Sequence, residues 1–151
     1  MLWLFLLDPT TRKEFIPVIR HLNVNASGQG LHSFTNQVRE LVHASGLQEG
    51  LCTLFIQHTS ASLLIQEDYD SSARIDLENW LNRLVPENDA LYTHTLEGAD
   101  DMPAHIKAAL TATQLSIPFE NTELLLGNWQ GIFLWEHRHH AGTRRIIAHL
   151  G

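Results

Sequence analysis

Three separate segments of the sequence carry side chains that could do chemistry. The first, His58-Thr-Ser-Ala-Ser62, follows a short apolar run, so we expect it where a buried strand gives way to a polar connection. A strand end holds the backbone still while its side chains reach a cleft. His58 carries an imidazole that titrates near neutral pH, and Thr59 and Ser60 offer hydroxyl and backbone N–H groups for an anion. The alternative is a histidine whose hydrogen bonds are satisfied locally in a serine-rich turn.

The second segment brings two histidines, His94 and His105, to a loop and the start of a predicted helix. Pro103 is typical of a first helical turn, so His105 lies near the helix N-terminus. The helix dipole disfavours a protonated ring there and favours the neutral form that binds metals. This spacing is compatible with zinc ligation but matches no compact zinc signature. A third ligand is needed, and His58 is the candidate because the single cysteine, Cys52, lies in an apolar run.

The third segment is a predicted C-terminal hairpin that gathers arginines. Strand alternation places His137 on one face and Glu136 and Arg138 on the other. If the hairpin pairs Arg138 with Arg144, then His137 faces Arg145 across the two strands. Such a cluster of cationic donors suits a phosphate or a carboxylate, whereas the alternative is a set of solvated charges at a hairpin tip. Glu136 could simply pair with one of these arginines.

The elements that position these segments follow from hydrophobic periodicity and turn residues. Segments whose apolar residues have helical spacing alternate irregularly with short apolar runs typical of strands. No linker or repeat divides the chain. This pattern favours a single α+β domain over a doubly wound α/β fold. We predict helices over residues 31–46, 70–86 and 101–113, and strands over residues 15–24, 51–56, 63–65, 115–119, 123–126, 131–137 and 144–150.

Composition excludes several classes of function. The chain has 151 residues and a formal charge of -7, which argues against a nucleic-acid partner. One cysteine excludes an intrachain disulfide framework and a cysteine-rich zinc site. Asp8-Pro9 ends the apolar N-terminal segment, which lacks the features of a signal peptide, and no stretch reaches the roughly 18–20 apolar residues of a membrane span. We therefore expect a cytoplasmic protein without a membrane partner.

The same three segments resemble the YjbQ-like family, which is described as a secondary thiamine-phosphate synthase family and was long considered uncharacterised. The resemblance runs from about Glu14 to Gly151 in the family's order and spacing. It is carried by Gln57-His-Thr-Ser-Ala-Ser-Leu63, Glu97-Gly-Ala-Asp-Asp-Met-Pro-Ala-His-Ile-Lys107, Trp129-Gln-Gly-Ile132, Glu136-His-Arg138 and Arg144-Arg145.

The resemblance implies a mixed, mostly antiparallel sheet curled into a half-barrel or sandwich, with about three helices, in a homotrimer. The family domain then covers residues 14–151, and residues 1–13 form an N-terminal extension or result from a misassigned start codon. Family members often carry a bound metal, thought to be zinc. The matching histidines here are His58, His94 and His105, while His137 also lies inside a family motif.

The family's activity joins a pyrimidine pyrophosphate to a thiazole phosphate and releases pyrophosphate. The corresponding hypothesis is a transferase in which Arg138 and Arg145 hold a phosphate, and in which Glu67, Glu136 or His137 moves a proton or orients a histidine. Carboxylates could instead bind magnesium, which is more usual for pyrophosphate transfer. The magnesium candidates are Asp68, Asp70, Asp100 and Asp101. The alternative hypothesis is a non-catalytic metal- or anion-binding module, and a partner-binding role draws support only from the four tryptophans.

Overall fold

The computed structural model describes residues 16–140 and 142–151. The predicted N-terminal extension over residues 1–13 lies outside the described residues. Within them the chain forms three helices and eight strands, and the expected single α+β domain is confirmed. None of the described helices combines the length and apolar character needed to cross a bilayer. In order, the elements are β1 (Val18–Ala26), β2 (Gly30–Ser33), α1 (Thr35–Ser45), β3 (Glu49–Ile56), β4 (Ala61–Glu67), α2 (Ser71–Leu84), α3 (Asp101–Leu110), β5 (Gln114–Glu120), β6 (Glu123–Leu124), β7 (Gln130–Glu136) and β8 (Gly142–Leu150).

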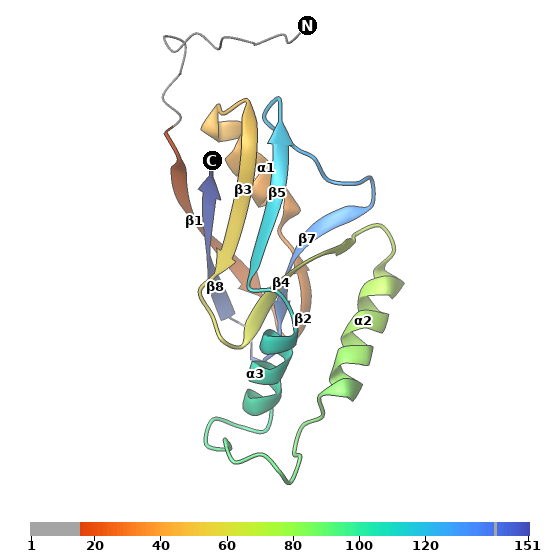
Figure 1. Cartoon of the computed structure of the whole chain (residues 1–151). Coiled ribbons are helices and arrows are strands. Elements are labelled where there is room, and N and C mark those ends of the chain that lie inside the picture. The colour runs from red at the N-terminus through yellow and green to blue at the C-terminus, as the bar shows by residue number, and fades with distance from the viewer. Residues whose placement is uncertain (1–15, 141) are drawn as a thin grey trace, which may run out of the picture.

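Two antiparallel sheets make up the framework. The larger has the strand order β1-β8-β3-β5-β6 and the smaller has the order β2-β7-β4. Every ladder between the named strands is antiparallel. Figure 1 shows β3 ending, and β4 and β8 beginning, at the same end of the molecule as α3. Segments that are far apart in the sequence therefore meet at this end.

The predicted C-terminal hairpin is wrong, because β7 and β8 belong to different sheets. β7 lies between β2 and β4, whereas β8 lies between β1 and β3. Arg144 is opposite Val24 and Arg145 is opposite Asn23, so neither pairs with Arg138 or His137. The physical reason is that both edges of β7 are already paired, one with β2 and the other with β4. β7 therefore has no free edge for β8, and its burial on both faces from Gly131 to Glu136 places it inside the fold.

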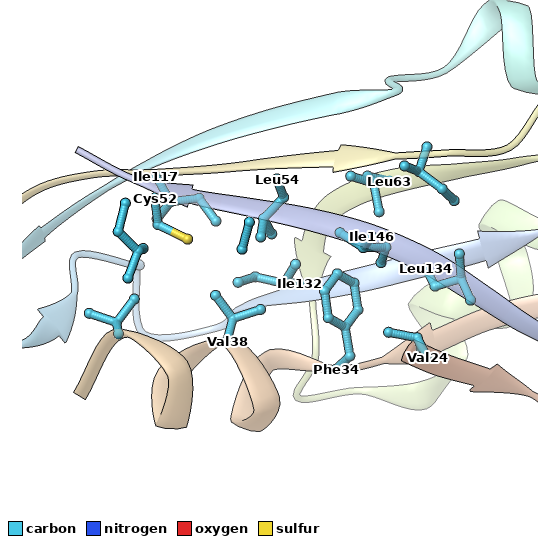
Figure 2. Packing of buried hydrophobic residues seen from close by; sticks show 14 of the residues in the cluster. Val24, Phe34, Val38, Cys52, Leu54, Leu63, Ile117, Ile132, Leu134 and Ile146 are labelled. Atoms are coloured by element: carbon cyan, nitrogen blue, oxygen red, sulfur yellow. The ribbon is translucent and has the colours of Figure 1, made fainter. Parts of the chain in front are cut away.

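The main core fills the space between the two sheets and α1 (Figure 2). Alternate residues of each strand point inward, such as Cys52 and Leu54 of β3 and Ile132 of β7. α1 adds Val38 and Val42, which lie one helical turn apart on its inner face. Since these side chains are almost inaccessible to solvent, the strand ends that carry the polar segments have a rigid support.

A second apolar cluster joins α2 to the outer face of the smaller sheet. Leu81 of α2 packs with Leu31, Phe133 and Trp135. The residues around Leu31, predicted as the start of a helix, form β2 instead. The backbone N–H of Leu31 donates to Glu78 of α2 at 2.7 Å, and its strand pairs with β7. This tertiary pairing outweighs the local helical periodicity.

Candidate functional site

A cavity of about 600 Å³ lies where the β3–β4 connection, the segment before α3, α3 itself and the end of β7 meet. It brings together six of the predicted metal and phosphate ligands, although they come from three separate segments. These lining residues are His58, Thr59, Ser60, His94, His105 and Arg138. Asp101 and Arg144 line the same cavity.

The potential metal ligands in this cavity are His94, Asp101 and His105. Their ligand atoms all lie within 4.8 Å of one another. The Oδ2 atom of Asp101 is 2.8 Å from Nε2 of His94 and 3.4 Å from Nε2 of His105. Asp101 was considered only as a magnesium ligand in the sequence analysis. The sequence could have indicated that Asp101 joins His105 as a ligand, because the two residues are four apart and share one face of the predicted helix. His58 lies in the same cavity but outside this group.

Local structure orients His105 for ligation. α3 begins at Asp101, as predicted, and His105 follows one turn further along. Nδ1 of His105 lies 3.0 Å from the backbone carbonyl of Thr59, which can only accept a hydrogen bond. The proton therefore resides on Nδ1, and the lone pair of Nε2 faces Asp101 and His94. Such a backbone contact is the usual way in which a metal-binding histidine is fixed in one tautomer.

Arg138 is held by acidic groups on the loop before α3. Its guanidinium donates to Asp100 at 3.0 Å, to Asp101, and to the carbonyl oxygen of Glu97 at 2.7 Å. Burial opposes ionisation of Asp100, but the N–H of His139 and the guanidinium of Arg138 outweigh it and lower its pKa. In this arrangement Arg138 orients Asp101. Its predicted role as a phosphate ligand would require some of these contacts to be exchanged.

A second arginine, Arg144, connects the cavity to the buried carboxylate of Glu136. Nε of Arg144 donates to Glu136 at 2.5 Å, and Nη1 of Arg144 is 2.7 Å from Nε2 of His58. Glu136 is fully buried and also accepts from the backbone N–H of Arg138 at 3.0 Å. Arg145, the predicted phosphate ligand, is exposed and points to the opposite face of β8. Arg144 is therefore the arginine of β8 that lines the cavity.

Two of the predicted catalytic residues lie away from the cavity. Glu67 ends β4 opposite Gln130, whereas the cavity is at the other end of that strand. His137 is 1% exposed, and its Nε2 is 2.9 Å from the hydroxyl of Ser62. Burial, and then the charge of Lys107, lowers the pKa of His137 to about 3. Its ring is therefore neutral and shielded from any ligand in the cavity.

The four carboxylates considered for magnesium do not converge. Asp68 accepts from Ser33 at 2.8 Å beyond the end of β4, and Asp70 caps α2 through the N–H of Ser72. Asp100 and Asp101 instead pair with Arg138 at the other end of the molecule. Among the described residues, the group that could hold a metal ion is therefore the one formed by His94, Asp101 and His105.

Comparisons with known proteins agree on one family. The family model described as "UPF0047 protein YjbQ-like" matches residues 20–151. The UPF0047 protein sll1880 of Synechocystis is 48% identical over 129 residues, which cover 85% of this chain and 88% of the relative. UPF0047 protein YjbQ of Escherichia coli O157:H7 is 44% identical over 130 residues, which cover 85% and 94% of the two chains.

Solved structures share the fold. The conserved hypothetical protein TT1486 of Thermus thermophilus has a TM-score of 0.79 at 32% identity, covering 87% of this chain and 99% of that one. A YbjQ-like protein of unknown function from Sulfolobus solfataricus has a TM-score of 0.78 at 22% identity, covering 89% and 98%. The names of these four relatives assign no activity to them.

Proposed function

This chain belongs to the UPF0047 YjbQ-like family, and we propose that it is a metal-associated transferase acting on a phosphorylated small molecule. The reaction we propose resembles that of thiamine-phosphate synthase, in which a pyrimidine pyrophosphate joins a thiazole phosphate and pyrophosphate leaves. The observation that carries the proposal is the convergence of His94, Asp101 and His105 in a cavity that Arg144 also lines.

The ligand set fits zinc better than magnesium. Two imidazole nitrogens and one carboxylate oxygen are typical of a catalytic zinc site with an open fourth position. Magnesium prefers a shell made up of oxygen atoms, and this group contains one carboxylate. When bound, zinc would supply Lewis-acid stabilisation of the negative charge that develops on a departing phosphate group.

The chain prepares two of these ligands before any metal binds. The carbonyl of Thr59 fixes the tautomer of His105, and Arg138 restrains Asp101. Ligands held in this way lose less conformational freedom on binding a metal. His94 is different because its side chain is 47% exposed, and it can move to admit a metal or a substrate.

The assay separates the transferase from the alternative, a non-catalytic binding module. Protein purified without chelator is examined by elemental analysis and by pyrophosphate release with the two thiamine precursors. We expect near-stoichiometric zinc and turnover, both lost in His94→Ala and His105→Ala. His21→Ala, on the exposed face of β1, is the matched control. Stoichiometric zinc without turnover would favour the binding module, and zinc retained in both variants would refute the metal site.

The homotrimer remains part of this proposal, and its support is the family resemblance. Sedimentation equilibrium of the full chain tests it directly. A mass of three chains supports the proposal, and a monomer overturns this part of it without affecting the metal site.

A further inference from the structure

The ring of His58 has an N–H donor against each of its two nitrogens. The backbone N–H of Ser60 donates to Nδ1 at 3.0 Å, and Nη1 of Arg144 lies 2.7 Å from Nε2. A neutral imidazole has one nitrogen that accepts a hydrogen bond and one that donates. One of these two contacts therefore brings two donors together.

The backbone contact determines which nitrogen accepts. Ser60 is 3% exposed. Among the described residues, the backbone N–H of Ser60 has Nδ1 of His58 as its acceptor. A buried backbone N–H without an acceptor is costly, whereas a partly exposed arginine head can shift. Nδ1 therefore accepts, and the proton is on Nε2. Burial, and then Arg144, lowers the pKa of His58, so the ring stays neutral at neutral pH.

This tautomer places two donors side by side at the wall of the cavity. Nε2 of His58 and Nη1 of Arg144 are 2.7 Å apart, and once the guanidinium N–H turns away from the ring, an oxygen beside the pair can accept from both. The positive guanidinium favours an anionic oxygen over a neutral one. Glu136, fully buried, holds Nε of Arg144, so the guanidinium stays at this wall of the cavity while its Nη1 end can turn.

We infer that His58 and Arg144 form a two-donor site for one oxygen of a phosphate group, and that His58 contacts the substrate and not the metal. The inference rests on the proposed function, because it places the phosphate of the proposed substrate beside the group formed by His94, Asp101 and His105. A nitrogen that carries a proton has no lone pair to offer a metal, and the other nitrogen of His58 is occupied by Ser60.

The first test measures binding of inorganic phosphate by calorimetry to the full chain purified without chelator. His58→Ala removes one donor, and we expect binding to weaken roughly tenfold while zinc content stays unchanged. His58→Gln can still accept from Ser60 and donate to phosphate, so we expect it to stay within about threefold of the wild type. His21→Ala is the matched control and should bind as the wild type does.

The second test reads the tautomer of His58 from the ring nitrogens of 15N-histidine-labelled protein. We expect a protonated Nε2, an unprotonated Nδ1, and a shift of the Nε2 resonance when phosphate is added. An unprotonated Nε2 in zinc-loaded protein, or zinc lost from His58→Ala, would overturn the inference. So would unchanged phosphate binding in His58→Ala, or no phosphate binding by the wild type.

The two proposals fail in different ways. Phosphate binding that depends on His58, in protein that holds no zinc and shows no turnover, refutes the proposed function alone. Zinc and turnover in the wild type, with phosphate binding independent of His58, refute this inference alone.

Discussion

His137 makes the folded protein sensitive to acid, because its imidazole is buried in the neutral form. The side chain is 1% exposed and contacts the hydroxyl of Ser62 at 2.9 Å. Burial is the main cause, and the charge of Lys107 the second, of a pKa lowered to about 3. The unfolded chain has no such constraint, and there the ring takes up a proton below about pH 6.5.

The size of the effect follows from these two pKa values. Because the unfolded state binds the proton first, stability falls as the pH drops from 6.5 towards 3. A single histidine with this shift removes about 2 kcal/mol from the free energy of unfolding at pH 5, and about 3 kcal/mol at pH 4. The lowered pKa of His58 acts in the same direction.

Urea denaturation of the wild type and of His137→Asn at pH 7 and pH 5 measures this contribution. We expect the variant to be less stable at pH 7, because it loses the contact between His137 and Trp135. Between the two pH values, however, it should lose about 2 kcal/mol less than the wild type. An equal loss in both proteins would refute the assignment of His137 as a buried neutral group. His21→Ala, which removes an exposed histidine, should follow the wild type.

Two further predictions concern the acidic loop and the single thiol. Arg138→Met leaves Asp100 and Asp101, both nearly buried, without their guanidinium, so urea denaturation should show a loss of about 3–5 kcal/mol. Zinc should bind roughly 10–100-fold more weakly in a chelator competition, and near-wild-type values for both would contradict the role given to Arg138. Burial raises the pKa of Cys52 to about 12. Mass spectrometry should therefore find Cys52 unalkylated by iodoacetamide in the folded protein and alkylated in urea. Rapid alkylation of the folded protein would show instead that the thiol is accessible.

The sequence was sufficient to predict which segments meet at the cavity. His58 follows the end of a strand, His105 lies in the first turns of a helix and His94 lies in the loop before that helix, and hydrophobic periodicity located these elements to within a few residues. Once the core forms between the sheets, the polar segments have one end of the molecule in common. Most of the residues that line the cavity were therefore predictable from the sequence, whereas Glu67, His137 and Arg145 lie away from it.

The pairing of individual side chains was not predictable, because it depends on which strands are neighbours. β8 joins the larger sheet, so Arg144 points into the cavity and Arg145 points away. A change of one residue along a strand moves a side chain to the other face. The near-continuous apolar run of β7 was a signal that this strand is covered on both faces. It did not reveal that β2 and β4 would flank it.

The overall charge of the chain does not determine what the cavity binds. Asp100 and Asp101 face Arg138, and Glu136 faces Arg144, so these charges largely offset each other. A divalent metal at the proposed ligands would add to the attraction for an anion, because its two positive charges exceed the single carboxylate among them. Metal and phosphate should then each strengthen the binding of the other, since such coupling is reciprocal. The zinc and phosphate measurements consequently examine two neighbouring parts of one site. Among the proposed metal ligands, His94 has the exposed side chain, so it is the ligand that can change position when metal or phosphate binds.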